Sequence, residues 1–350
     1  MPLSKPQKQK ISIEVIKTLV TRFESFPEDA SNNRNAPFHE AFLNAFSDKL
    51  QGKVSDVPFF ISLSSWLQGL NTTLGQTFFE NVAHILCNGE KREYTSKKLG
   101  NSAITQKQKD VVNRIITDLS TSTVLPNLVN ENALLYQAYN SPLVNAIDFS
   151  ADVFFEDANS VTAIELKSVR PNSGEMRGEK MKILEGKAAL YRLFPNKDIH
   201  FYIGFPFDPT VNPTKENVTG YDKTRFLGSI INMSKYFDSK ETLIAGELWD
   251  FLSGMKNTME EILEIINAIS TVDFLKKYQL LKDNTMRNTS EYDMQLQEWN
   301  LFSEISIVDN NSAIQANLNT APLTRIFNKT IFDSKGDYNW DRYNTLKAFI

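Results

Sequence analysis

Three side chains suited to metal-ion chemistry, Asp152, Glu165 and Lys167, lie within one short stretch of this 350-residue sequence. The apolar and β-branched residues around them predict a hairpin with strands over 153–155 and 161–169. Asp152 stands at the start of that hairpin. Because alternate residues of a strand point to the same face, Glu165 and Lys167 project together from the second strand. The pattern therefore predicts an Asp, a Glu and a Lys that converge on one face.

This combination of residue types can activate water at a phosphate group. Mg²⁺ prefers oxygen ligands and retains several waters, so two carboxylates and a substrate phosphate suffice to bind it. A bound metal stabilises charge that develops on phosphorus and lowers the pKa of a coordinated water. A neighbouring ammonium can position that water or neutralise the phosphate. The alternative interpretation is a surface hairpin with solvated charges, because the Glu-x-Lys pattern alone is common.

The first carboxylate of the pair has a competitor. Asp148 would share a strand face with residues 150 and 152, because the side-chain period of a strand is two. We prefer Asp152, because it directly precedes the apolar triplet 153–155.

A helix with a further carboxylate is predicted upstream of the hairpin. Residues 75–87 carry apolar side chains at helical spacing, and Glu80 stands among them. A buried carboxylate needs a partner, because an isolated charge is costly to remove from water. Glu80 is therefore interpreted either as a secondary metal ligand or as a residue at the edge of the apolar stripe.

The hairpin resembles the signature of the PD-(D/E)XK nuclease superfamily. In that signature an Asp is followed, after a gap, by Glu-x-Lys, and here twelve residues separate Asp152 from Glu165. Ala151 replaces the Pro that often precedes the Asp.

Two longer segments resemble the TdeIII-type family of type II restriction endonucleases. The first is the run from 165 to 182, and the second is the segment 246–254. Together with the hairpin, the resemblance covers roughly residues 70 to 255.

The resemblance implies a Mg²⁺-dependent type II restriction endonuclease that hydrolyses double-stranded DNA and leaves 5′-phosphate and 3′-hydroxyl ends. It places the metal on Asp152 and Glu165, with the backbone carbonyl of Leu166 as an additional ligand and Glu80 as a secondary one. Lys167 would orient the attacking water or help to deprotonate it.

The resemblance also implies partners. A palindromic recognition site suits a two-fold symmetric homodimer in which each subunit reads one half-site. A cognate DNA methyltransferase is the expected functional companion. Two other functions remain open from the sequence, namely a structure-specific repair or junction-resolving nuclease with the same metal site, and a non-catalytic DNA-binding protein.

Four side chains directly beyond the Glu-x-Lys strand are candidates for reading DNA: Arg170, Asn172, Arg177 and Lys180. An Arg can bind guanine and an Asn can bind adenine through paired hydrogen bonds. Contacts with phosphate would instead give affinity without sequence information. Position alone does not separate these two kinds of contact.

A second candidate segment for DNA contact is the loop over 206–227, which combines Gly and Pro with the cations Lys223 and Arg225. The alternative interpretation is a solvated surface turn. The cluster of basic residues over 95–115 is a further candidate, and a solvated loop is again the alternative.

Composition excludes several classes of protein. Charged residues make up 23% and hydrophobic residues 41%, as in ordinary globular proteins. No run approaches the roughly 20 apolar residues of a membrane span, and the polar N-terminus lacks an apolar signal core, so we expect a cytoplasmic protein that makes no membrane contact. The single Cys87 excludes an intramolecular disulfide, and the three histidines lack zinc-ligand spacing.

The order of predicted elements fits an α/β fold with a mixed central sheet flanked by helices, to which the resemblance adds a restriction-endonuclease-like core. We expect an N-terminal helical region over 1–70, the nuclease core over 71–255 and a mainly helical C-terminal region over 256–350. A single compact domain that holds all three is the alternative.

Local signals place several elements within this order. Thr105 and Gln108 have the spacing of a capping box that opens a helix. Residues 175–193 are predicted as a helix, 198–205 as a buried strand, and 206–224 as a long loop.

Overall fold

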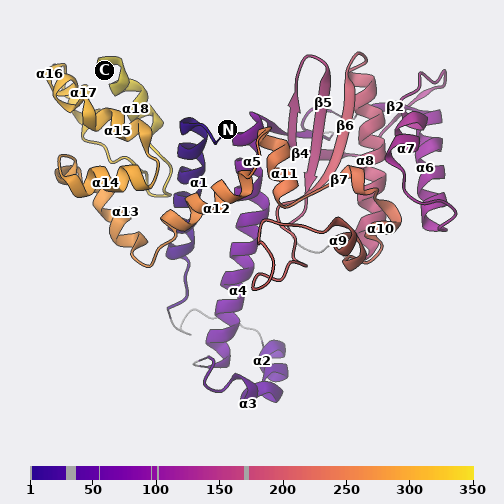
Figure 1. The fold of residues 1–350 in the computed structure, drawn as a ribbon, viewed down its shortest axis with the longest axis horizontal. Coiled ribbons are helices and arrows are strands. Elements are labelled where there is room, and N and C mark those ends of the chain that lie inside the picture. Colours follow the sequence, from indigo (N-terminus) through magenta and orange to yellow (C-terminus); the bar gives the residue numbers. More distant parts are fainter. Residues whose placement is uncertain (1, 29–36, 55, 96, 101, 169–172) are drawn as a thin grey trace. The chain divides into compact units, whose positions relative to one another are not determined.

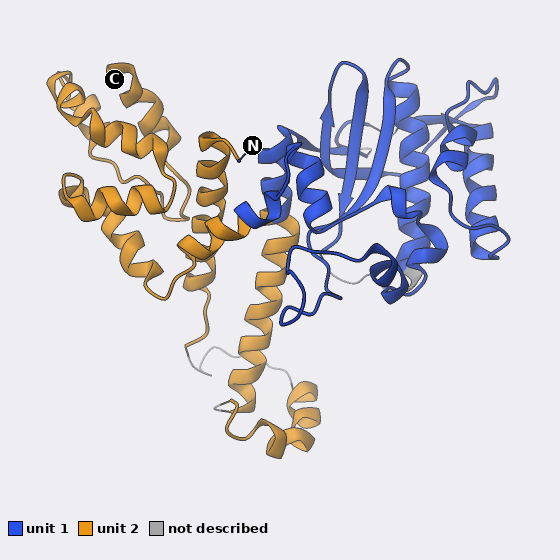
Figure 2. Cartoon of the chain, in the orientation of Figure 1, with its two compact units in different colours: residues 1–2, 79–261 blue, residues 3–78, 262–350 orange. Residues whose placement is uncertain are grey.

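The computed structural model describes residues 2–28, 37–54, 56–95, 97–100, 102–168 and 173–350. The chain forms two compact units, shown in different colours in Figure 2. The first unit consists of residues 1–2 and 79–261, and the second consists of residues 3–78 and 262–350.

The first unit is built on a five-stranded mixed sheet with the order β1-β4-β5-β6-β7 (Figure 1). The strands are β1 Glu90–Tyr94, β4 Phe149–Glu156, β5 Ser160–Leu166, β6 Asp198–Phe205 and β7 Thr242–Ile244. The pairs β1–β4 and β4–β5 are antiparallel, whereas β5–β6 and β6–β7 are parallel. A separate two-stranded sheet pairs β2 Ala103–Thr105 with β3 Leu143–Asn145.

The helices of the first unit cover both faces of the large sheet. They are α5 Phe79–Cys87, α6 Gln106–Ser120, α7 Leu128–Leu135, α8 Ser173–Leu193, α9 Lys223–Ser229, α10 Met233–Tyr236 and α11 Gly246–Ser253. Gly186 of α8 lies so close to Phe201 that an added Cβ would meet the ring at 2.7 Å, and Leu248 of α11 lies against Gly204. Because residues 201 and 204 point to opposite faces of β6, α8 and α11 lie on opposite sides of the sheet.

Burial on both faces explains the sequence of the central strands. Residues 161–166 of β5 are all buried, and they form a nearly continuous apolar run broken by Thr162 and Glu165. Strands covered on both faces have such runs in place of a polar alternation. Glu165 is therefore an exception that the surrounding structure must accommodate.

A β-bulge interrupts the ladder between β1 and β4. Glu90 pairs with Phe154 and Arg92 with Ala151, so Asp152 and Val153 together lie opposite the single residue between them, Lys91. Such a bulge places an extra residue in one strand and redirects a side chain. Asp152 is one of the two residues in the bulge.

Most predicted elements of the first unit are confirmed. The strand β6 has the predicted bounds, and α8 begins two residues before the predicted start at 175. Thr105 accepts a hydrogen bond from the backbone of Gln108, whose side chain accepts one in return, so the capping box is present. The mixed sheet flanked by helices confirms the predicted α/β class.

Other elements differ from the prediction. β4 begins at Phe149, four residues earlier than predicted, because its first half pairs with β1. β1 was not predicted, since the charged run Glu90–Glu93 has no apolar alternation and lies at the edge of the sheet. The short strands β2, β3 and β7 and the helix α7 were also not predicted.

A buried ionic network connects α8 to its neighbours in the first unit. The Lys180 ammonium lies 2.6 Å from Glu131 Oε2 of α7 and is also paired with Glu241. Lys187 Nζ lies 3.1 Å from the other oxygen of Glu241. All four side chains are buried, so two positive and two negative charges compensate one another out of water.

The second unit is helical in its described residues. Its helices are α1 Lys5–Glu24, α2 Pro37–Leu43, α3 Ser47–Leu50, α4 Val57–Thr73, α13 Phe274–Lys282, α14 Ser290–Glu298, α15 Phe302–Asp309, α16 Asn311–Ala316, α17 Ala321–Phe327 and α18 Trp340–Leu346. α12, Thr258–Ile269, begins in the first unit and ends in the second. A fully buried ion pair joins α15 to α18, with Arg342 donating to both oxygens of Glu304 at 2.6 and 3.0 Å.

We expect Glu241→Gln to destabilise the protein strongly. The change leaves Lys180 and Lys187 buried with one negative partner, and breaking a buried pair costs about 3–5 kcal/mol. Urea unfolding at neutral pH measures this loss. Burial alone would raise the pKa of Glu241, but Lys187 and Lys180 outweigh it and hold the pKa below its ordinary value. The stabilisation is therefore present above the ordinary pKa and is lost as the pH falls through the lower folded pKa.

The matched control is Glu216→Gln, which breaks an exposed ion pair with Arg225 in the same unit. Exposed pairs contribute little, so this variant should unfold at the wild-type urea concentration. Equal midpoints for both variants would show that the buried network does not stabilise the fold.

Candidate active site

The β4–β5 hairpin brings Asp152 and Glu165 together. Val153 pairs with Ile164, so Asp152 and Glu165 are the next residues along the two antiparallel strands and lie opposite each other. Both side chains are buried. The Asp152 side chain accepts a hydrogen bond from the backbone N–H of Leu166 at 2.9 Å, which fixes its orientation.

The bulge gives Asp152 a second constraint. Its carbonyl accepts a hydrogen bond from Nε2 of His84 on α5, at 2.7 Å. A residue in a bulge is removed from the regular ladder, so its backbone groups need other partners. The helix α5 therefore holds the backbone at Asp152, while β5 holds its carboxylate.

Lys167 follows the last residue of β5 and stays close to Glu165. Its backbone N–H donates to the carbonyl of Gly204 at 2.8 Å, which continues the pairing with β6. Its ammonium lies 3.2 Å from Glu165 Oε1 and 2.9 Å from Glu179 Oε1 of α8. Lys182 of α8 also reaches Glu165 Oε1, at 2.8 Å.

Glu80 approaches the same hairpin from α5. The ammonium of Lys91 lies 3.1 Å from both oxygens of Glu80 and 3.0 Å from Oδ1 of Asp152. A single cation therefore bridges a helix carboxylate and a hairpin carboxylate. The structure brings the four predicted residues Glu80, Asp152, Glu165 and Lys167 into one region.

The electrostatics of this region reflect crowded negative charge. Burial, followed by the charge of Asp152, raises the pKa of Glu165. Burial and the charge of Asp152 also raise the pKa of Glu80, although the hydrogen bond from Lys91 opposes them. Raised pKa values mean that the charged carboxylates are unfavourable in this place without a cation.

The described residues contain no group of three or more Asp, Glu, His or Cys side chains arranged to hold a metal ion by themselves. Mg²⁺ does not need such a group, since one or two carboxylates, waters and a substrate phosphate suffice. Oε2 of Glu165 is buried and has no hydrogen-bond partner among the described residues, so this oxygen is a candidate ligand for a cation. Asp152 and Glu165 therefore fit a divalent ion.

Asp148, the competing carboxylate, lies elsewhere. It precedes the first residue of β4 and is exposed to solvent. Asp152 rather than Asp148 is hydrogen-bonded to Leu166 and lies beside Glu165.

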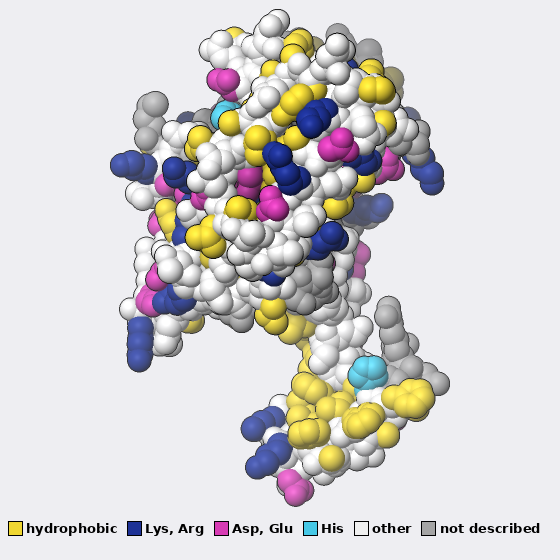
Figure 3. Space-filling view, turned by 90° about the vertical axis from the view of Figure 1, so that its right-hand side faces the viewer, with side chains coloured by type: hydrophobic (Ala, Val, Ile, Leu, Met, Phe, Trp, Pro, Cys, Tyr) yellow, Lys and Arg dark blue, Asp and Glu magenta, His cyan; other side chains and the backbone are white. Residues whose placement is uncertain are grey.

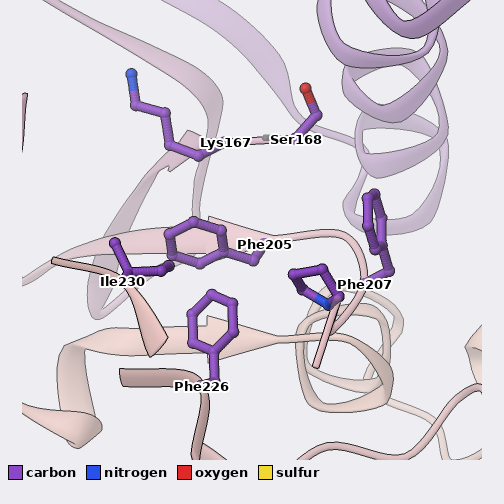
Figure 4. Close-up of a pocket in the computed structure, with 7 residues that line it drawn as sticks. Lys167, Ser168, Phe205, Phe207, Phe226 and Ile230 are labelled. Carbon is purple, nitrogen blue, oxygen red and sulfur yellow. The ribbon is translucent and has the colours of Figure 1, made fainter. Parts of the chain in front are cut away.

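A small apolar pocket lies next to Lys167 at the carboxyl ends of the parallel strands (Figure 4). The residues that line it are Lys167, Ser168, Phe205, Phe207, Pro209, Phe226 and Ile230. In Figure 4 the ammonium of Lys167 points away from Phe205 and Phe226. The apolar pocket therefore packs against the base of the Lys167 side chain and leaves its charged end toward the carboxylates.

The four residues after β5 that were predicted to contact DNA differ in their exposure and in whether the structure describes them. Arg170 and Asn172 lie outside the described residues. Arg177 is exposed on α8 and is available for contact. Lys180 is buried in the ionic network with Glu131, so we do not propose a DNA contact for it.

The two cations of the loop over 206–227 are near the surface but paired. Lys223 and Arg225 lie in the first turn of α9, a helix that was not predicted at this position and that is capped by Asp222. Lys223 Nζ lies 2.8 Å from Glu247, and Arg225 makes two 2.8 Å hydrogen bonds with Glu216. A DNA phosphate would have to compete with these carboxylates.

Four residues of the site were not predicted from the sequence: His84, Lys91, Glu179 and Lys182. Glu179 and Lys182 stand one helical turn apart on α8, a spacing that places both on one face. Both lie within the run 165–182, so the sequence evidence for them was the resemblance of that run to the TdeIII-type family. Lys91 gave no signal, because it belongs to a charged edge strand.

Comparison with known proteins identifies the class. The family model described as "Type II restriction endonuclease, HinfI" matches residues 3–270. The chain belongs to this family, and it is a type II restriction endonuclease, a site-specific deoxyribonuclease. The prediction of a type II restriction endonuclease is thereby confirmed over its two alternatives, a repair or junction-resolving nuclease and a non-catalytic DNA-binding protein.

A particular relative supports the same conclusion. The chain is 45% identical over 363 residues to the type II restriction enzyme MjaII of Methanocaldococcus jannaschii, an alignment that covers 98% of this chain and 96% of the relative. Among the described residues, none of the helices has the length and apolar character needed to cross a membrane.

We expect Lys91→Met to strengthen binding of a divalent ion in the absence of DNA. The Lys91 ammonium occupies oxygens of Glu80 and Asp152, and a competitor for the same ligands lowers the apparent affinity. Titration calorimetry with Mn²⁺ should show a several-fold lower Kd for the variant. Its melting temperature without metal should fall, because two carboxylates lose their counterion.

Lys197→Met is the control, since Lys197 pairs with Glu156 at the far end of β4, 3.1 Å away. This variant should bind Mn²⁺ as the wild type does. Unchanged or weaker Mn²⁺ binding by Lys91→Met would mean that Lys91 does not compete with the metal.

Proposed function

We propose that this restriction endonuclease has a PD-(D/E)XK core and hydrolyses double-stranded DNA in a Mg²⁺-dependent reaction at Asp152, Glu165 and Lys167. The observation that carries the proposal is the pair of buried carboxylates on one hairpin, with the Lys167 ammonium 3.2 Å from Glu165. The position of Glu80 on the preceding helix gives further support. The assignment to a TdeIII-type subgroup stays a prediction.

Asp152 and Glu165 would hold the metal, with the carbonyl of Leu166 as an additional ligand. When bound, Mg²⁺ would stabilise charge on the scissile phosphate and lower the pKa of a coordinated water. The Leu166 N–H and His84 keep Asp152 in place without needing the metal. Such preorganisation matters, because a site that is already aligned does not reorganise during the reaction.

Lys167 would position the attacking water. Its ammonium donates hydrogen bonds to Glu165 and Glu179, so one proton remains for a further acceptor. Burial lowers the pKa of Lys167, but the charge of Glu165 and the hydrogen bond that Lys167 donates to Glu179 outweigh this and raise it. The side chain is therefore protonated near neutral pH and suits the positioning of a nucleophile better than the removal of its proton.

Cleavage would leave a 5′-phosphate and a 3′-hydroxyl, and the enzyme would act as a homodimer that reads a palindromic site. Arg177 is the described candidate for contact with DNA near the site, and Lys223 and Arg225 are candidates for phosphate contact. We expect the enzyme to act in the cytoplasm beside a cognate methyltransferase, because unmodified host DNA would otherwise be cut.

Asp152→Asn and Glu165→Gln should each abolish cleavage of a long plasmid in Mg²⁺. Each change removes a negative charge but keeps the size of the side chain. Binding of duplex DNA should persist, because repulsion between carboxylate and phosphate decreases. Gel analysis of plasmid fragments measures the first property, and fluorescence anisotropy measures the second.

Asp148→Asn is the control for these variants and should give the wild-type fragments. If Asp148→Asn is inactive while Asp152→Asn is active, the metal ligand on β4 is Asp148 and the proposed site is wrong.

Lys167→Ala should lower the cleavage rate by at least about two orders of magnitude, the scale of a positioned acid–base group. DNA affinity should change little, since Lys167 is engaged by two carboxylates. Single-turnover kinetics separate the rate from the affinity. A loss of affinity that accounts for the whole effect would assign Lys167 to DNA binding in place of catalysis.

A further inference from the structure

The surface of the second unit contains a region with little charge and much apolar area. We define the apolar segment as residues 37–54 and 56–73, which form α2, α3, α4 and the 3₁₀ turn Asn44–Phe46. None of the residues in these four elements is buried. Figure 3 shows hydrophobic side chains gathered on this part of the surface.

Three phenylalanines dominate the exposed area. Phe38 is 78% exposed, Phe42 is 77% exposed and Phe46 is 55% exposed. Scattered apolar residues on a surface are normal, but a contiguous group marks an interaction site. Removal of a Phe side chain from water is favourable, so the isolated chain forgoes a large stabilisation here.

The helix α4 extends the same character. Its 17 residues contain no Asp, Glu, Lys or Arg. A helix of this length is about 25 Å long at 1.5 Å per residue. Trp66 anchors α4 within the second unit, because its indole N–H donates to the carbonyl of Arg22 at 3.0 Å and its ring packs edge-on against Phe26.

The absence of charge on α4 restricts the partner. DNA is bound through Lys and Arg at its phosphates. α4 offers none, and the two lysines of the apolar segment, Lys49 and Lys53, are accompanied by the acidic residues Glu40, Asp48 and Asp56. Helices that lie on membranes combine an apolar face with a Lys- and Arg-rich face, which α4 also lacks. What remains is another apolar protein surface of low net charge.

A second copy of this chain provides such a surface. In a two-fold symmetric interface the same patch meets itself, so any charge close to the axis faces an identical charge. An uncharged helix avoids that repulsion. A buried aromatic side chain covers roughly 150–250 Å², so three phenylalanines would supply a large part of the about 800 Å² per partner in a standard interface.

We propose that the apolar segment is the surface through which two copies of this chain associate. The proposal rests on the proposed function in one respect, since a palindromic site calls for two subunits. Each subunit would bring one hairpin site, and the pair would cut both strands. The apolar segment itself would contact neither the metal nor the DNA.

The test is the mass of the protein in solution without DNA or metal. Light scattering on a sizing column should give twice the 39.9 kDa chain mass for the wild type. The double variant Phe38→Glu/Phe42→Glu should give the single-chain mass, because four like charges would meet at the interface. Its far-UV circular dichroism should match the wild type, since neither side chain is part of the core.

Val272→Glu is the matched control, since Val272 is an exposed apolar residue of the second unit outside the apolar segment. It should remain a dimer. A monomeric wild type, or a double variant that stays dimeric, would overturn the proposal. A monomeric wild type that binds lipid vesicles or DNA through this segment would assign the surface to that other partner.

The experiments distinguish a failure of this interface proposal from a failure of the proposed active site. A wild-type dimer that dissociates on Phe38→Glu/Phe42→Glu supports the interface even if Asp152→Asn still cleaves DNA. Conversely, loss of cleavage in Asp152→Asn together with a monomeric wild type would leave the active site in place and reject the interface.

Discussion

Two buried carboxylates, Asp152 and Glu165, lie side by side, and their mutual repulsion is the constraint to which the surrounding structure responds. Water cannot screen them well, so positive charge has to come from the protein or from a bound ion. Lys91, Lys167 and Lys182 approach from an edge strand, from the end of β5 and from α8. The attraction between these lysines and the carboxylates therefore holds three separate elements together at one point.

The helix α8 connects this site to the interior. Glu179 and Lys182 face the hairpin, whereas Lys180 and Lys187 enter the buried network with Glu241. Because a buried network tolerates little displacement, it fixes the rotation of α8 about its axis. The position of the charges at the site therefore depends on ion pairs that do not contact it.

The sequence was sufficient for elements with a clear period and for residues that neighbour one another along the chain. The strand at 198–205, the capping box at Thr105 and the Glu165–Lys167 pair follow from local rules. The edge strand β1 did not, since its pairing with β4 is non-local and its residues are charged. For the same reason Lys91 was not predicted. Lys180 was predicted to contact DNA, but it is buried among carboxylates, and the order of residues along the chain does not reveal such burial.

The bulge at Asp152 and Val153 makes the site sensitive to chain length as well as to residue type. Removing one residue there would restore a regular ladder and turn the preceding residues of β4 to the opposite face. Phe149 would then leave its place against Phe201 and α8. A single-codon deletion that spares every charged residue of the site would thus disable it. Transfer of the hairpin to another scaffold would need the bulged strand pairing along with the carboxylates.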